Sequence, residues 1–146
     1  MVKGVYVLAI SVCRDAAAEI GALGLISFRK GIYAYVGSAQ KGLESRLRRH
    51  FRKRKREFWH IDYLLSKPQA NIVDVFYKEG GKREECRAAE MLAEESGFAV
   101  RGFGCSDCNC KSHLFFFENV EKLERICLAL DFVPLSRQRV ITLRNV

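Results

Sequence analysis

The chain contains the stretch Tyr35-Val36-Gly37-Ser38-Ala39 and, two residues later, Gly42-Leu43-Glu44-Ser45-Arg46-Leu47-Arg48-Arg49-His50-Phe51. Residues 32–36 are mostly β-branched or aromatic, which predicts a strand that ends at Gly37-Ser38. From Leu43 onward an apolar residue recurs every four positions, which predicts an amphipathic helix. A glycine-containing turn therefore joins a strand to a helix.

Arg46 and His50 lie four residues apart, so both project from one side of the predicted helix, next to the strand that carries Tyr35. The planar guanidinium of an arginine suits phosphate oxygens, and a histidine or a phenol can move protons or hold a water molecule. This arrangement suits an enzyme that cuts phosphodiester bonds. Ordinary helices with surface arginines show the same spacing, so spacing alone leaves both interpretations open.

The stretch resembles the second half of the GIY-YIG nuclease motif, in which a tyrosine-bearing strand precedes a helix with an arginine. Tyr35-Val36-Gly37 matches YIG, Arg46 matches the arginine, and His50 matches a histidine of some homing endonucleases. Gly4-Val5-Tyr6, at the start of an expected strand, then takes the place of GIY. Gly31-Ile32-Tyr33 has the literal spelling, but it shares a strand with Tyr35, and we interpret it as a coincidence.

Three downstream segments are similar to one branch of these proteins, the small and mainly archaeal Uri-type endonucleases: Trp59–Leu65, Glu85-Cys86 and Phe103–Leu114. The resemblance covers roughly residues 4–118. The interval between Tyr6 and Tyr35 is longer than is usual in the family, because residues 16–30 are inserted. We expect an extra strand or hairpin there, since apolar residues alternate around three glycines.

The order of elements predicts an α/β (α+β) fold, a small mixed β-sheet with packed helices. Beyond the segments above, the patterns predict these elements: a helix over 58–66, a strand over 72–77, a helix over 83–95, a strand over 114–117 and a helix capped by Asn119. We expect a single domain over 1–146, with a core over 4–97 and a cysteine-rich loop and C-terminal strand and helix over 98–146. Residues 135–146 carry no assignment.

With 146 residues and 49% hydrophobic content, the chain can bury a substantial core. No apolar run approaches the roughly 20 residues of a membrane span, and the N-terminus lacks a signal-peptide pattern. We therefore expect a cytoplasmic protein without a membrane partner. In that reducing compartment its 6 cysteines would be thiols or metal ligands rather than disulfides.

The net charge of +8 and the pI of about 9.4 indicate a polyanion-binding protein. Much of the charge lies within one run after Arg46: Arg48, Arg49, Arg52, Lys53, Arg54, Lys55 and Arg56. Charge runs are commonly solvated surfaces, but like charges this close repel one another, and a nearby polyanion would relieve that cost. We expect these residues to contact a nucleic-acid backbone rather than its bases.

The GIY-YIG resemblance implies metal-dependent hydrolysis of a nucleic-acid phosphodiester. It places a Mg2+ (or Mn2+) ligand on the 83–95 helix, where Glu84 and Glu85 compete. We choose Glu85, which shares the inward face with Ala88 and Leu92. Tyr6 or Tyr35 would orient or deprotonate the attacking water, Arg46 would stabilise charge on phosphorus, and His50 would assist proton transfer or bind phosphate.

A second cluster has the pattern C-x2-C-x-C-x2-H, formed by Cys105, Cys108, Cys110 and His113. C-x2-C spacing lets two thiolates reach one tetrahedral zinc, whereas C-x-C is less usual. A structural Zn2+, free packed thiols and an oxidised pair all remain possible. The other cysteines, Cys13, Cys86 and Cys127, are expected in the core. His60, beside Trp59 at an expected helix start, is expected to pack or cap there more than to catalyse.

The sequence thus predicts a metal-dependent endonuclease, with DNA favoured over RNA as substrate. An alternative function is a non-catalytic nucleic-acid-binding module with a zinc-organised Cys/His loop. A third is an interaction domain in which that loop docks a partner. Convergence of Tyr6, Tyr35, Arg46 and Glu85 on one open cleft would favour the enzyme.

Overall fold

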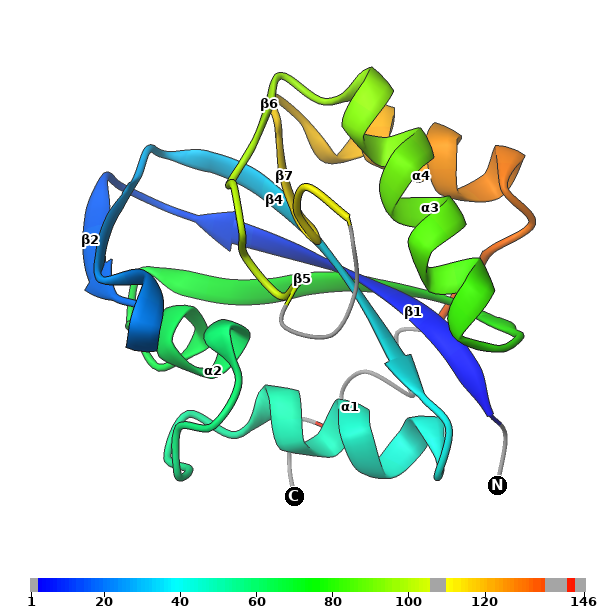
Figure 1. Cartoon of the computed structure of the whole chain (residues 1–146), viewed down its shortest axis with the longest axis horizontal. Coiled ribbons are helices and arrows are strands. Elements are labelled where there is room, and N and C mark those ends of the chain that lie inside the picture. Colours follow the sequence, from blue (N-terminus) through cyan, green and yellow to red (C-terminus); the bar gives the residue numbers. More distant parts are fainter. Residues whose placement is uncertain (1–2, 106–109, 136–141, 144–146) are drawn as a thin grey trace.

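The computed structural model describes residues 3–105, 110–135 and 142–143. Its main sheet has the strand order β6-β7-β4-β1-β5-β8, and a separate pair, β2-β3, flanks it (Figure 1). The elements are β1 (Gly4–Val12), β2 (Ala16–Glu19), the 3-10 turn η1 (Gly21–Leu23), β3 (Leu25–Phe28), β4 (Gly31–Ala39), α1 (Leu43–Phe51), α2 (His60–Leu65), β5 (Ala70–Glu79), α3 (Lys82–Glu95), β6 (Phe98–Ala99), β7 (Leu114–Phe117), α4 (Val120–Ala129) and β8 (Val133–Pro134).

The predicted fold class is confirmed, including the inserted hairpin and the C-terminal strand and helix. The sheet itself is not mixed, because all the described pairings are antiparallel. The strands β4 and β5 run in the same direction, but β1 lies between them and pairs with both. Among the described residues, no two hydrogen-bonded strands of this sheet are therefore parallel.

Helices cover both faces of the sheet, with α1 and α2 on one side and α3 and α4 on the other (Figure 1). Alternate residues of β1 supply the two cores, since side chains along a strand point to opposite faces. Tyr6, Leu8 and Ile10 pack with the α1–α2 layer. Val5 and Val7 pack with the α3–α4 layer. Each helix within the described residues is too short or too polar to serve as a membrane span.

The β1–β4 ladder is continuous from Gly4↔Ala39 to Val12↔Gly31. The inserted hairpin leaves from the Val12 end, so it does not disturb the register near Tyr6. The prediction that β4 ends at Gly37-Ser38 was wrong, because the first residues of β1 pair with them and extend the strand to Ala39. As a result, Tyr6 lies opposite Gly37 and Leu8 lies opposite Tyr35.

Other boundaries differ from the sequence patterns by a few residues. The strand over 114–117 and the Asn119 cap are confirmed, since Asn119 Oδ1 accepts a hydrogen bond from the Lys122 amide at 2.9 Å. The patterns missed β6 and β8, which have two residues each. Cys127 is buried as expected, but Cys13 is exposed because it follows the last residue of β1.

Glycine at position 37 is required by the packing of Tyr6. A Cβ atom built on Gly37 would lie 2.4 Å from both Cζ and the hydroxyl oxygen of Tyr6. Tyr6 is only 1% exposed and cannot move toward solvent without leaving the core. The glycine of the Tyr35-Val36-Gly37 motif therefore makes room for a buried phenol on the neighbouring strand.

We predict that Gly37→Ala lowers the free energy of unfolding by about 1–3 kcal/mol, because the added methyl group overpacks the Tyr6 ring. Gly81→Ala is the matched control, since a Cβ there has no neighbour within 4 Å and its φ of −93° suits alanine. Because Gly81 is the N-cap of α3, where alanine is less favourable than glycine, its effect should be small but not zero, below about 1 kcal/mol. Equal effects in urea unfolding would contradict this account of Gly37.

Candidate active site

Four of the predicted site residues line one open cleft of about 710 Å³: Tyr6, Tyr35, Arg46 and Glu85. The cleft lies at an edge of the sheet, because β7 pairs with β4 only as far as Tyr35. Beyond that point the start of α3 lines the cleft from the α3–α4 layer, and Gly104, whose amide donates to His60 of α2, lines it from the α1–α2 layer. The remaining lining residues are Gly37, Ser38, Gln40, Lys41, Phe58, Trp59, His60, Lys82 and Gly104.

The two cleft tyrosines are neutral phenols held by the core. The Tyr6 hydroxyl is hydrogen-bonded to Nε2 of His50 at 2.6 Å, and the two tyrosine rings lie 6.5 Å apart. Burial raises the pKa of Tyr6 far above its usual value, although the charge of Arg46 acts in the opposite direction. Burial also raises the pKa of Tyr35 well above its usual value. Both phenols are therefore protonated at neutral pH; the Tyr35 hydroxyl can donate a hydrogen bond, whereas the Tyr6 hydroxyl is already engaged with His50.

His50 lies behind Tyr6 and is not among the residues that line the cleft. It is 2% exposed. Burial lowers the pKa of His50 well below its usual value, and the charges of Lys55, Arg46 and Arg49 lower it further. The side chain is therefore a neutral partner of Tyr6. Direct phosphate contact, one of its two expected roles, does not fit this position.

Arg46 is held in the cleft by two contacts. Its Nη1 donates to the carbonyl oxygen of Ser38 at 3.2 Å, and its guanidinium carbon lies 4.3 Å from the centre of the Trp59 ring. Cation–π stacking on an indole orients the guanidinium without neutralising its charge. The expected position of Arg46 beside the strand that carries Tyr35 is confirmed.

Arg49, which was expected to face bulk solvent or a nucleic-acid backbone, instead forms an ion pair within the protein. Its Nη2 forms an ion pair of 2.6 Å with Asp62, which is 0% exposed. The same carboxylate oxygen accepts the backbone amides of Phe58 and Trp59. Asp62 therefore caps the start of α2, and Arg49 supports that cap.

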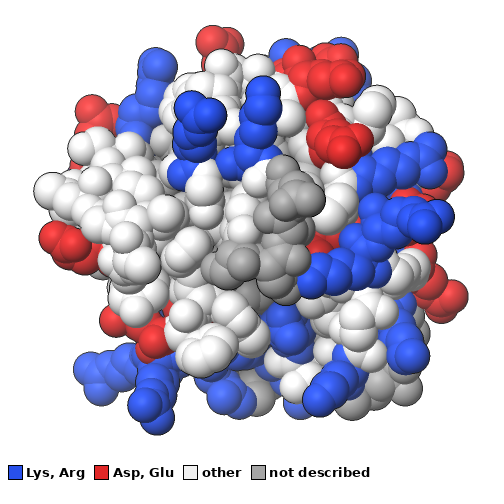
Figure 2. Space-filling model, in the orientation of Figure 1, with Lys and Arg blue, Asp and Glu red and all other residues white. Residues whose placement is uncertain are grey.

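The rest of the basic run divides into structural and exposed side chains. Lys53 donates to the carbonyl oxygens of residues 65, 67 and 70, and Lys55 donates to those of residues 49 and 50. Arg48 pairs with Glu44 at 3.0 Å. In the part of the chain that the structure describes, the side chains of Arg52, Arg54 and Arg56 are exposed. Figure 2 shows Lys and Arg side chains along the lower margin, where α1 lies in Figure 1.

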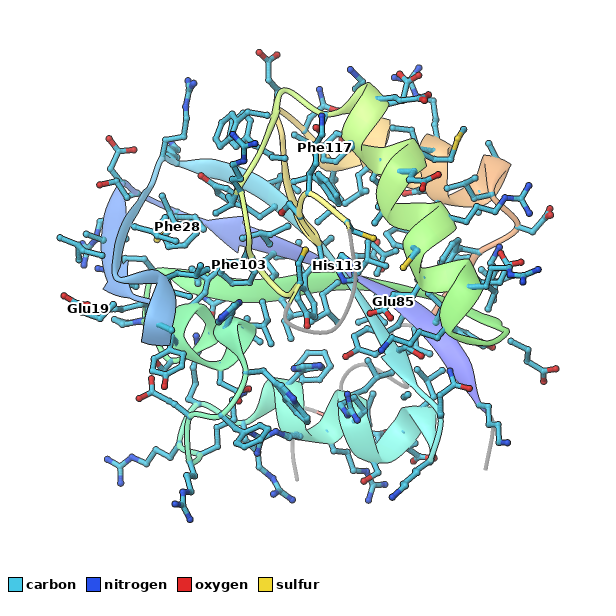
Figure 3. The ribbon with its side chains drawn as sticks, in the orientation of Figure 1. Glu19, Phe28, Glu85, Phe103, His113 and Phe117 are labelled. Carbon is cyan, nitrogen blue, oxygen red and sulfur yellow. The ribbon has the colours of Figure 1, made fainter. Side chains whose placement is uncertain are left out.

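The choice of Glu85 over Glu84 agrees with the geometry. Glu85 is 8% exposed and lines the cleft, whereas Glu84 pairs with Lys78 at 3.0 Å on the outside of α3. The Glu85 Oε2 atom lies 3.3 Å from Nδ1 of His113, and Figure 3 shows these two side chains next to each other. A carboxylate that is mostly buried yet open to a cleft can bind a divalent cation.

The expected zinc ligands are only partly brought together. Cys110 and His113 lie close together, but their third partner is Cys86 of α3, and the ligand atoms of these three residues are all within 4.8 Å of one another. Cys105 is not part of this group, and its thiol lies 3.4 Å from the carbonyl oxygen of Phe103. Cys108 lies outside the described residues. The expectation that Cys86 is a core residue was wrong, because Cys86 is partly exposed and lies in this group with Cys110 and His113.

Two cleft residues had no assigned functional role in the sequence. Phe58 is 76% exposed at the cleft, and its ring lies 5.7 Å from that of Trp59. Nδ1 of His60 accepts a hydrogen bond of 2.8 Å from the Gly104 amide, and this bond connects α2 to the cysteine-loop segment. This supports the expected packing role of His60. An aromatic pair directly after a basic run is the signal that could have indicated Phe58.

We predict that the protein loses stability as the pH falls below about 6.5. His50 stays neutral in the folded state because its pKa is lowered, so the unfolded chain binds more protons in acid. For the one proton that His50 binds only in the unfolded chain, each pH unit below about 6.5 should lower the free energy of unfolding by up to about 1.4 kcal/mol. In urea unfolding between pH 7.5 and 5, His50→Gln should flatten this dependence even if it is less stable at pH 7.5. An unchanged slope would contradict a neutral buried His50.

The comparison with protein families gives one assignment. A family model described as "Domain of unknown function DUF123" matches residues 5–131. No curated protein and no solved structure matches the chain. The match extends from the second residue of β1 through α4 and so includes the cleft and the cysteine segment. The chain therefore belongs to the DUF123 family.

Proposed function

We propose that this protein is an endonuclease of the GIY-YIG superfamily, Uri type, which hydrolyses phosphodiester bonds of DNA with a divalent metal ion. One observation carries the proposal. Tyr6, Tyr35, Arg46 and Glu85 come from four different elements, and all four line the same cleft. A structural or docking role would not require two phenols, a guanidinium and a carboxylate to share one opening.

The cleft fits Mg2+ or Mn2+ at Glu85. Magnesium sites that act on phosphates commonly use one or two carboxylates, with water and substrate oxygens completing the coordination. The Glu85 side chain is 11% exposed and reaches the cleft, so it can offer an oxygen while the remaining positions stay open. A bound ion would supply Lewis-acid polarisation of the scissile phosphate.

The protein groups would act by position and charge. Arg46, oriented by Ser38 and Trp59, would hold the phosphate and stabilise the charge that develops on it. Because burial raises the pKa values of both tyrosines, a phenol is better suited to orient the attacking water than to deprotonate it as a free phenolate. The neutral His50 would fix the direction of the Tyr6 hydroxyl.

The surface beside the cleft suits a nucleic acid. Arg52, Arg54 and Arg56 follow α1 with exposed side chains, and Phe58 stands exposed at the cleft itself. Arginines bind backbone phosphates, and an exposed aromatic ring can stack on an unpaired base. The proposed substrate is therefore DNA with an unpaired nucleotide near the cut.

We predict that the full-length protein cuts such DNA in Mg2+ or Mn2+ and that Glu85→Gln lowers the rate by about a hundredfold or more. Glu84→Gln is the matched control, because it removes the neighbouring carboxylate, which pairs with Lys78 outside the cleft. The control should cut within a few-fold of wild type. Gel assays under single-turnover conditions with flap, branched, duplex and single-stranded substrates measure both variants.

The reverse result, with Glu84→Gln inactive and Glu85→Gln active, would show that the metal ligand is misassigned. Tight binding by wild-type protein without cutting in either metal would instead favour the alternative, a non-catalytic nucleic-acid-binding module. Binding to these substrates is therefore measured in parallel by fluorescence anisotropy.

We predict that replacing Arg52, Arg54 and Arg56 by alanine flattens the salt dependence of DNA binding. Removing one arginine that neutralises a phosphate should lower the log–log slope by about 0.9, so removing three should lower it by about 2.7. The reduction should be similar for DNA of different sequences, because these arginines bind the backbone. Lys53 and Lys55 are left in place, because they hold backbone carbonyls around α1 and α2.

The matched control replaces Arg14, Arg101 and Arg125, which are exposed and lie outside the basic run. It removes the same formal charge. If both triple variants change the slope equally, binding depends on net charge alone and the proposed path beside the cleft is wrong.

A further inference from the structure

We propose that Cys86, Cys110 and His113 form a binding site for a soft transition metal, with Zn2+ as the expected ion. We further propose that this site positions Glu85. The site is separate from the Mg2+ or Mn2+ position in the cleft. Its existence does not depend on the proposed hydrolysis, whereas its effect on Glu85 deepens that proposal.

The three ligand atoms are already close enough for small adjustments to close a site. They lie within 4.8 Å of one another. In a tetrahedral zinc site, with bonds of about 2.3 Å to sulfur and about 2.0 Å to nitrogen, ligand atoms are separated by roughly 3.5–3.8 Å. The ligand atoms must therefore move closer together than they are now. Rotation of the Cys86 and Cys110 side chains can bring them closer, because neither side chain is fully buried and the two lie on separate segments.

The chemistry of the donors selects the metal. Two thiolates and an imidazole suit Zn2+ and related soft ions, whereas Mg2+ and Ca2+ prefer oxygen donors. The donors also come from parts of the chain that a metal would connect. Cys86 is on α3, and Cys110 and His113 precede β7. A metal ion bound to all three residues would cross-link the segment before β7 to α3, the helix that carries Glu85.

The backbone of His113 is fixed on two sides. Its amide donates to the carbonyl oxygen of Phe103 at 2.8 Å, and its own carbonyl oxygen accepts the Val36 amide at 2.9 Å. The ring is 2% exposed. The imidazole is thus held between the cysteine side chains and the cleft.

His113 connects the metal site to the cleft. Its Nδ1 faces Glu85 Oε2 at 3.3 Å, so we assign Nε2 to the metal. Histidines that bind metals commonly donate their second N–H to a carboxylate, which fixes the orientation of both groups. Metal binding at His113 would therefore hold the Glu85 carboxylate in one orientation. His113 is a positioning residue in this proposal and does not touch the substrate.

The first experiment tests the metal site itself. Chelator-treated full-length protein is titrated with Co2+, and the thiolate-to-cobalt charge-transfer band is followed by absorption. Wild type should bind one ion per chain with this band, Cys86→Ser should lose the band, and Cys13→Ser should keep it, because Cys13 is exposed and outside the cluster. If wild type lacks the band, or if Cys86→Ser retains it unchanged, the site is disproved.

A second measurement uses only the wild-type protein, so its result does not depend on whether a variant folds. Alkylation by iodoacetamide is mapped by mass spectrometry with and without Zn2+. Zinc should protect Cys86 and Cys110 by tenfold or more and leave Cys13 unchanged. Protection of Cys110 without protection of Cys86 would show that the loop binds metal on its own, and equal labelling with and without zinc would show that no such site forms.

The second experiment tests the effect on Glu85. Mn2+ binding is measured by electron paramagnetic resonance with zinc-loaded and zinc-free protein, and Glu85→Gln identifies the cleft site by its loss. Zinc removal should weaken Mn2+ binding about tenfold, as loss of an outer-shell partner typically does. Equal Mn2+ affinity in the two forms would overturn the positioning role. Because this readout needs no cleavage, it stays interpretable even if the protein cuts no DNA.

Discussion

The packing of Tyr6 against Gly37 is the contact on which the arrangement of the cleft depends. A buried phenol needs both space and a hydrogen-bond partner. Gly37 on β4 leaves the space, and His50 on α1 supplies the partner at 2.6 Å. These contacts fix β1, β4 and α1 relative to one another. Tyr35 and Arg46 lie on two of these elements and therefore reach the same opening.

The second constraint is the short pairing between β7 and β4. Because the ladder stops at Tyr35, the last part of β4 lies at an open edge of the sheet. Through this edge Glu85, from the layer of α3 and α4, meets side chains from the layer of α1 and α2. His113, directly before β7, lies beside Glu85 at the same edge. The cleft and the Cys86, Cys110 and His113 cluster are thus neighbours because one strand is short.

Local patterns in the sequence predicted much of this arrangement. Strand alternation and helical spacing depend on near neighbours, so β1, β4, α1 and the inward face of Glu85 could be predicted from the chain. Contacts between distant segments could not. The pairing of Arg49 with Asp62 and the approach of Cys86 to His113 depend on how the layers pack. The two-residue strands β6 and β8 are too short to leave a pattern.

The most direct test of a metal-dependent nuclease cleft is a crystal structure of the protein with Mn2+ and a DNA flap that carries a phosphorothioate at the cut. The account predicts an anomalous manganese peak at the Glu85 carboxylate, with the modified phosphate between that ion and Arg46. It also predicts that the Tyr6 hydroxyl keeps its hydrogen bond to His50 in this complex. Manganese bound elsewhere, or DNA that crosses another face and leaves the cleft empty, would contradict the account.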